Sequence, residues 1–239
     1  MPNPTAAMLV IGDEILSGRT RDANMHHLAG RLTEAGITLG EVRIVSDDHD
    51  AIVAALNALR RAWDTVFTSG GIGPTHDDIT ADAVGAAFGV SVGVREDARQ
   101  LLADHYARTG SELNEARLRM ARIPDGATLI ENPVSVAPGF TIGNVHVMAG
   151  VPAVFQAMVA TILPTLTGGT PLTSTSTRID RGEGDIAGPL GEIAAAFPDL
   201  SLGSYPFQKD GRFGANVVIR GQDADLVAEA TDRLRTAFP

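Results

Sequence analysis

A glycine-rich segment beside acidic residues is the part of this sequence best suited to chemistry. Residues 68–80 read TSGGIGPTHDDIT and follow the apolar run 64–69, which predicts a buried strand. Glycines at a strand end can adopt positive φ and bring backbone N–H groups close to an oxyanion. A tight turn is the simpler reading, and the spacing matches neither the P-loop nor the dinucleotide fingerprint. We expect a phosphate group to bind at these positions: Gly70, Gly71, Gly73, Pro74 and Thr75.

Carboxylates follow three of the predicted strands. Asp13 and Glu14 come after the first strand, Asp47 after the second, and Asp77 and Asp78 after the third. The carboxyl ends of neighbouring parallel strands meet at one edge of a sheet, so these groups could share one crevice. Each also fits an ordinary helix cap or first-turn position. Beside a bound phosphate, a carboxylate would need a bridging Mg²⁺ or a ring or ribose donor.

Composition and net charge limit the classes to which this protein can belong. The chain has 239 residues, a net charge of −10 and no cysteine, so disulfides and thiolate chemistry are excluded. The acidic balance argues against nucleic acid or anionic lipid as a partner. The first residues, MPNPTAAMLVIGDEI, predict a buried strand, not a signal peptide, and no apolar run has the length of a membrane span. We expect a cytoplasmic protein.

The elements that position these residues alternate between strand and helix. Strands are predicted at 6–11, 38–45, 64–69, 127–130 and 141–148. Helices are predicted at 22–35, after the aspartates at 47 and 48, from near Asp78 to Gly89, over 96–120 in two pieces, and from Pro152. This order favours an α/β fold with a mostly parallel sheet covered on both faces.

A second, smaller domain is expected after a change in composition. Residues 165–177, TLTGGTPLTSTST, are rich in Thr and Ser and favour a boundary. We therefore assign residues 1–168 to the α/β domain and 169–239 to a small α+β domain of KH-like or ferredoxin-like arrangement. Asp185 is expected to cap a helix there, and Asp210-Gly211 to turn a hairpin. The GRFG run at 211–214 matches a KH-type G-x-x-G loop, but it opens a strand, so a hairpin is the better reading.

Several motifs resemble one known family. VIGDEILSGRTRDAN (10–24), VSDDHD (45–50) and TSGGIGPTHDDITADAV (68–84) resemble the molybdopterin-binding (MoaB/Mog-type) fold family. The subgroup is that of competence/damage-inducible protein A and the amino-terminal domain of eukaryotic FAD synthase. NPVSVAPGF (132–140) and MAGVPAVFQAM (148–158) extend the resemblance, which covers about residues 6–166 with the motifs in order.

The resemblance implies a three-layer α/β/α fold that binds molybdopterin or a nucleotide diphosphate at the glycine loop. It implies functional roles for Asp47 and Asp78, as catalytic groups or ligands of a divalent metal such as Mg²⁺, Mn²⁺ or Co²⁺. It extends the binding site to Asp13, Glu14, Asn24 and Gly150. The alternative function that it implies is a metal-dependent pyrophosphatase that cleaves ADP-ribose or FAD and releases AMP. Relatives associate as dimers or trimers, so a homo-oligomer is expected.

The sequence departs from the family pattern at two loops. Many relatives carry a proline and a glutamate where this chain has Ala149 and Val154. Where many read NPxGTAPG, this chain reads NPVSVAPG, with Val136 in place of threonine. If these groups contact metal or substrate, hydrolysis is weakened while binding survives.

Overall fold

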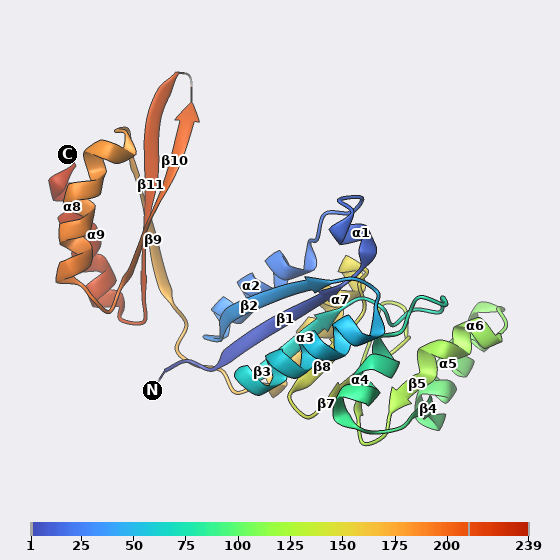
Figure 1. Ribbon diagram of the computed structural model, residues 1–239. Helices are drawn as coiled ribbons and strands as arrows, with labels where there is room; N and C mark the ends of the chain where they lie inside the picture. The colour runs from blue at the N-terminus through green and yellow to red at the C-terminus, as the bar shows by residue number, and fades with distance from the viewer. Residues whose placement is uncertain (1, 210, 239) are drawn as a thin grey trace. The chain divides into compact units, whose positions relative to one another are not determined.

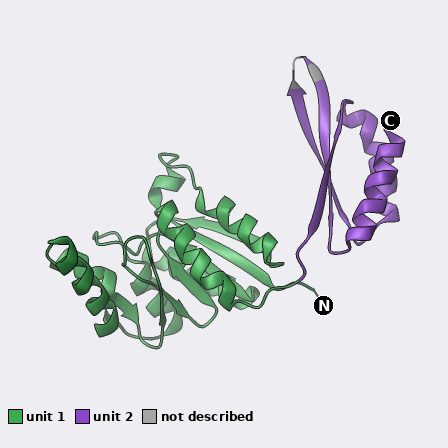
Figure 2. Ribbon diagram, turned by 180° about the vertical axis from the view of Figure 1, so that it is seen from behind, with its two compact units in different colours: residues 1–169 green, residues 170–239 purple. Residues whose placement is uncertain are grey.

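The computed structural model describes residues 2–209 and 211–238 and contains two compact units, Met1–Gly169 and Thr170–Pro239. Figure 2 colours these units separately. Unit 1 holds the glycine loop and the acidic strand ends at Asp13, Asp47 and Asp78.

Unit 1 is built on a six-stranded sheet of order β2-β1-β3-β8-β7-β6. The first four strands in that order are parallel, and β7 and β6 are antiparallel to their neighbours. The strand bounds are β1 (Thr5–Ile11), β2 (Thr38–Val45), β3 (Thr65–Ser69), β6 (Thr128–Ile130), β7 (Gly139–Ile142) and β8 (Val145–Met148). The single strand expected at 141–148 is wrong. It is a hairpin, because Gly143 adopts φ 56° and reverses the chain between β7 and β8.

Helices cover both faces of this sheet, which confirms the three-layer α/β/α prediction (Figure 1). On one face, Leu56 and Val84 of two helices pack against Leu9 and Val66 of the sheet. On the other face, Leu28 and Phe155 pack against Met8 and Phe67. The first pair is α3 (His49–Ala62) and α4 (Thr80–Phe88), and the second pair is α2 (Asn24–Glu34) and α7 (Pro152–Ile162).

An additional subregion lies between α4 and β6. A two-stranded antiparallel sheet, which was not predicted, joins β4 (Val92–Val94) to β5 (Arg122–Pro124). Between these strands lie α5 (Glu96–Thr109), α6 (Glu115–Leu118) and the 3₁₀ turn η1 (Arg119–Ala121). This subregion brings η1 next to the glycine loop, because Arg119 donates to the Thr75 carbonyl.

The register of the sheet aligns the carboxyl ends of its parallel strands. Ile11 of β1 pairs with Val45 of β2, and Ser69 of β3 pairs with Met148 of β8. The loops after all four strands therefore leave the same edge of the sheet. The short helix α1 (Asp13–Leu16) forms part of the loop after β1.

Unit 2 consists of a three-stranded antiparallel sheet of order β10-β11-β9 with two helices on one face. Unit 1 ends after the 3₁₀ turn η2 (Leu163–Thr165). The elements of unit 2 are β9 (Thr173–Ile179), α8 (Glu183–Ala196), β10 (Ser201–Lys209), β11 (Arg212–Gly221) and α9 (Ala224–Ala237). Asp185 does not cap α8, because the helix begins earlier with Gly182 at the cap position. Asp210, expected in the hairpin turn, lies outside the described residues. Within the described ranges, no helix has the length and apolarity to cross a membrane.

Candidate functional site

A pocket of about 470 Å³ opens at the carboxyl edge of the parallel strands. The loops after β1, β2, β3 and β8 line it, together with residues 132–137 and the start of α7. This volume falls in the range of small-molecule sites. Most of the residues predicted for the site line this pocket: Glu14, Asp47, Gly70, Gly71, Gly73, Pro74, Asp78 and Gly150. Asp13, Asn24 and Thr75 do not line it but support residues that do.

The glycine loop needs its glycines for its own packing. Gly70 and Gly71 adopt φ 110° and 67°, and a Cβ on Gly70 would lie 2.1 Å from the carbonyl oxygen of Ile11. A Cβ on Gly71 would lie 2.1 Å from Oγ1 of Thr80. The turn itself requires these glycines, and a loop of this shape can also bind a phosphate, so the two interpretations of the segment are compatible.

Three successive residues of this loop have backbone N–H groups without a described partner. The N–H groups of Gly71, Ile72 and Gly73 donate to no other described residue, and all three residues line the pocket. The first turn of α7 begins at the same pocket, with Val151 at its cap position and Val154 in its first turn. Amides at a helix start have no partner within the helix and carry a partial positive charge. This side of the pocket thus suits an anion.

Asp78 is held by the loop and not by the helix. Its Oδ2 accepts hydrogen bonds from Thr75 N at 2.8 Å and Thr75 Oγ1 at 2.5 Å. A Cβ on Gly73 would lie 2.7 Å from the same oxygen, so Gly73 makes room for this carboxylate. The helix predicted to end at Gly89 is confirmed, but α4 begins at Thr80 with Ile79 at its cap position, so the reading of Asp77 and Asp78 as first-turn residues is wrong. Asp77 and Asp78 therefore precede the helix.

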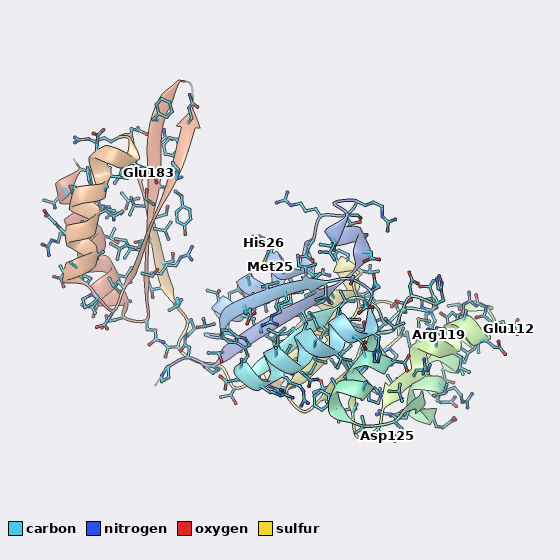
Figure 3. The ribbon with its side chains drawn as sticks, in the orientation of Figure 1. Met25, His26, Glu112, Arg119, Asp125 and Glu183 are labelled. Atoms are coloured by element: carbon cyan, nitrogen blue, oxygen red, sulfur yellow. The ribbon has the colours of Figure 1, made fainter. Side chains whose placement is uncertain are left out.

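Arg119 of η1 fixes this turn from outside the loop (Arg119 is labelled in Figure 3). Its Nε donates to the carbonyl oxygen of Thr75 at 3.1 Å, and its Nη2 to that of Asp78 at 3.3 Å. Sequence reasoning missed Arg119. No local signal marks it, because it lies 44 residues from Thr75 along the chain.

Asp47 is a pocket carboxylate whose pKa is raised. Burial raises its pKa, and so do the negative charges of Asp13, Glu14 and Asp77. The hydrogen bond that its Oδ2 accepts from the Asp13 amide, at 2.9 Å, acts in the opposite direction. The ionised form of a carboxylate that lies near other carboxylates is stabilised when a ligand offers it a hydrogen-bond donor or a cation.

The charged groups that line the pocket are all acidic among the described residues. They are Glu14, Asp47, Asp77 and Asp78. No three Asp, Glu or His side chains in that part of the chain are placed to share a metal ion. Asp78 also directs one oxygen to Thr75. No such set supports the metal site predicted at Asp47 and Asp78, so their role as metal ligands stays a prediction and no catalytic step is assigned to a metal.

Asn24 lies behind the pocket. It is 3% exposed, and its Nδ2 donates to Ser69 Oγ and to the carbonyl oxygen of Gly150, both at 2.7 Å. Asn24 therefore ties the end of β3 to the loop after β8. Its Oδ1 has no hydrogen-bond partner among the described residues.

A second asparagine organises the loop on the other side of the pocket. Asn132 is 4% exposed, accepts from the amides of Val134 and Ser135, and donates to Ser135 Oγ and to the Ala137 carbonyl. Val136 in this loop has φ 67°, an unfavourable conformation for a β-branched residue. Asn132 was not predicted as a site residue, although the NPVSVAPG motif contains it.

The fold and the pocket define a class of α/β proteins with a pocket at the carboxyl edge of the sheet. A family model described as "Probable molybdopterin binding domain" matches residues 7–168, and "FAD synthase, middle domain" matches residues 171–239. The first match covers more than half of the chain, so this chain belongs to the molybdopterin-binding-domain family. The resemblance found in the motifs is confirmed.

Relatives agree with this assignment. The chain is 40% identical over 206 residues to a CinA-like protein of Citrifermentans bemidjiense, a match that covers 84% of this chain and 48% of that protein. It is 35% identical over 215 residues to a protein of Pyrobaculum calidifontis, covering 85% and 81%. The crystal structure of CinA from Thermoplasma acidophilum, described as of unknown function, matches with a TM-score of 0.63 and 32% identity, over 69% of this chain and 99% of that one. The chain spans about half the length of the first of these relatives.

Proposed function

We propose that this protein binds a phosphorylated pterin of the molybdopterin type in the 470 Å³ pocket. The observation that carries the proposal is that two kinds of group line one pocket. The first kind is backbone: the amides of Gly71, Ile72 and Gly73 have no described hydrogen-bond partner, and helix α7 begins at the pocket. The second kind is acidic: carboxylates line the pocket without a basic side chain among the described lining residues. The amides would receive the phosphate.

The carboxylates of the pocket favour a donor-rich ring. The 2-amino and ring N–H groups of a pterin can donate side by side to one carboxylate, and charge-assisted bonds of this kind are strong. Asp47 is suited to this role because burial and neighbouring negative charges disfavour its ionised form without a partner. A phosphate alone would gain nothing from these carboxylates.

A pyrophosphatase acting on ADP-ribose or FAD is the second candidate. The carboxylates that line one pocket favour it, since such enzymes use acidic groups around metal and water. Two observations weigh against it: the lack of a three-residue metal set among the described residues, and the apolar Val154 at the pocket wall. We therefore rank binding above hydrolysis.

Calorimetric titration with neopterin monophosphate, neopterin and inorganic phosphate tests the proposal. The phosphorylated pterin should bind most tightly, because only it engages both the amides and the carboxylates. Asp47→Asn should weaken its binding about tenfold, the loss of one charge-assisted hydrogen bond. The matched control is Asp50→Asn, whose side chain is 97% exposed and outside the pocket lining. Equal binding by wild type and Asp47→Asn would refute the assignment of the ring to this carboxylate.

Product analysis separates the two candidates. ADP-ribose and FAD are incubated with the protein and Mg²⁺, Mn²⁺ or Co²⁺, and AMP is measured by chromatography. No AMP is expected. AMP formation that Asp78→Asn abolishes would replace the binding proposal with the pyrophosphatase.

A further inference from the structure

Helices α8 and α9 cover one face of the sheet in unit 2 and leave its other face open (Figure 1). Side chains along a strand point alternately to the two faces of a sheet. In β11 the buried residues Ala215, Val217 and Ile219 belong to the core that α8 and α9 complete. The even-numbered residues of β11, and the residues that pair with them, therefore point to the opposite side, here called the open face.

The strand register places an aromatic, an amide and a basic side chain in one row of the open face. Asn216 of β11 pairs with Tyr205 of β10 on one side and with Arg178 of β9 on the other. Tyr205 is 52% exposed. Asn216 is half-buried, and its side-chain amide has no hydrogen-bond partner among the described residues. The centre of the open face thus holds an exposed ring beside an unpaired amide.

Gly203 allows the ring of Tyr205 to lie flat against the sheet. A Cβ built on Gly203 would lie 3.2, 3.4 and 3.3 Å from Cε2, Cζ and Oη of Tyr205. Such nearly equal distances mean that the ring presents its face, and not its edge, to the glycine. One face of the ring therefore rests on β10, and the other is available to a second planar group.

Arg220 lies beside this ring. Gly203 pairs with Val218 and Ser201 with Arg220, so Arg220 is the diagonal neighbour of the glycine under the ring. Diagonal neighbours in a sheet are roughly 7–8 Å apart, within reach of a long side chain. Arg220 is exposed, and its side chain has no ion pair or hydrogen bond among the described residues. Its guanidinium group can therefore bind an anion next to the ring of Tyr205.

A second ring on the open face already has a cation stacked on it. The guanidinium carbon of Arg178 lies 4.4 Å from the ring centroid of Phe207, and Arg178 Nε donates to Asp180 at 2.7 Å. Gly214 makes room for this ring, because a Cβ there would lie 2.4 Å from Cζ of Phe207. The open face thus holds two aromatic rings with a glycine beneath each, and the outer face of Tyr205 is the one without a described partner.

The charges of unit 2 are divided between its two layers. The sequences of β9, β10 and β11 contain no Asp or Glu. The helices carry the acidic residues Glu183, Asp185, Glu192, Asp225, Glu229 and Asp232. A phosphate is therefore favoured on the sheet and not on the helices. The net charge of −10 on the whole chain opposes a long polyanion, which favours a single nucleotide over a nucleic acid strand.

We propose that the open face of unit 2 binds a mononucleotide, with its base stacked on Tyr205 and its phosphate bound by Arg220. Stacking of a base on an aromatic side chain and a charge-assisted bond between arginine and phosphate are both strong contacts. Asn216 lies beside Tyr205 and can pair with N6 and N7 of an adenine. The site uses no residue of the pocket in unit 1, so it gives unit 2 a ligand of its own.

NMR of the full chain with labelled tyrosine rings tests this site, because the chain has two tyrosines, Tyr106 in unit 1 and Tyr205 in unit 2. Tyr205→Phe assigns the two sets of signals. Titration with AMP should shift the Tyr205 signals until they saturate and leave those of Tyr106 in place. Adenosine and ribose 5-phosphate each lack one of the two contacts, so each should need about tenfold higher concentration. A ligand bound in the unit 1 pocket does not move the Tyr205 signals, so this proposal and the pterin proposal fail separately.

Two variants test the roles of the individual residues. Arg220→Gln should weaken AMP binding about tenfold and leave adenosine binding unchanged, because only AMP carries the phosphate. Gly203→Val should weaken the binding of both ligands, because the added side chain lifts the ring of Tyr205 from the sheet. The matched control is Phe213→Ala: Phe213 is 64% exposed on the same strand as Arg220 but points to the face of Ala215. This variant should bind AMP as the wild type does, and circular dichroism shows whether each variant is folded.

Four results would overturn the proposal. The first is a Tyr205 signal that AMP does not shift, and the second is equal binding of AMP and adenosine. The third is a loss in folded Phe213→Ala as large as that in Arg220→Gln. The fourth is an oligoadenylate that saturates Tyr205 at a concentration more than about tenfold below that of AMP, which would replace the mononucleotide with single-stranded nucleic acid.

Discussion

His146 gives unit 1 a measurable pH dependence. This residue of β8 is 7% exposed, and it packs against Phe67 with the ring centroids 5.3 Å apart. Its Nδ1 lies 2.9 Å from Thr141 Oγ1, which can donate to the neutral ring. Burial lowers the pKa of His146 to about 4, from an ordinary value of 6.5. The fold therefore holds the imidazole neutral where the unfolded chain would protonate it.

The pH dependence of stability follows from the difference in the number of protons bound by the folded and unfolded states. Between pH 6.5 and pH 4 the unfolded state binds a proton that the folded state does not, so stability falls as the pH falls. A difference of 2.5 pKa units, with the folded group half titrated at pH 4, corresponds to a loss of about 3 kcal/mol in the free energy of unfolding. Well above pH 6.5 the imidazole is neutral in both the folded and the unfolded state, so His146 no longer lowers the free energy of unfolding.

Urea denaturation followed by the fluorescence of Trp63 measures this loss in unit 1, because the chain has one tryptophan. Other groups also titrate in this range, so the useful quantity is the difference between wild type and His146→Asn. That difference should change by about 3 kcal/mol in favour of the variant between pH 7.5 and pH 4. His76→Asn, at a side chain that is 99% exposed, is the control and should follow the wild type.

The result that would refute this reasoning is a constant difference between wild type and His146→Asn across the same range. It would mean that His146 keeps an ordinary pKa, and hence that water reaches its ring in the folded protein.

Two further predictions concern local backbone structure. Val136→Gly should leave stability unchanged or raise it by up to about 1 kcal/mol, because relief of a positive-φ strain outweighs the added chain entropy. Val134→Gly in the same loop is the control, and chemical denaturation measures the free energy of unfolding of both variants. A larger loss of stability in Val136→Gly than in Val134→Gly would contradict backbone strain at Val136. Asp48→Ala should cost about 1 kcal/mol in the same measurement, because Asp48 accepts from Ala51 N at 2.8 Å as the cap of α3. A loss as small as that of Asp50→Ala would contradict this capping role.

Patterns between near neighbours predicted much of the fold. The alternation of apolar strands and amphipathic helices predicted the layers, and the aspartates at 47 and 48 predicted the start of α3, which Asp48 caps. The prediction of 141–148 as one strand was wrong, because an apolar run with a short Gly-Asn interruption is compatible with either a strand or a hairpin. Asp78 was expected at a helix start, but it closes a turn with Thr75.

The site was predicted only as far as its glycines and strand ends. Asn132 was missed because its role depends on the path of its own loop, which the motif alone does not specify. Asn24 was expected at the ligand but supports the pocket from behind, through a bond to Gly150 across 126 residues. The divalent metal expected at Asp47 and Asp78 has no matching set of ligands among the described residues.

The sequence by itself determined which loops carry the candidate site residues, since glycines, prolines and carboxylates act on the backbone within a few residues of themselves. The tertiary structure decided which of those groups face one another. It brought Arg119 to the turn at Asp78, placed Asp47 among other acids, and left β2 at an open edge. The physical reason is that these relations depend on the packing of helices against the sheet and on strand order, which residues distant in the sequence fix together.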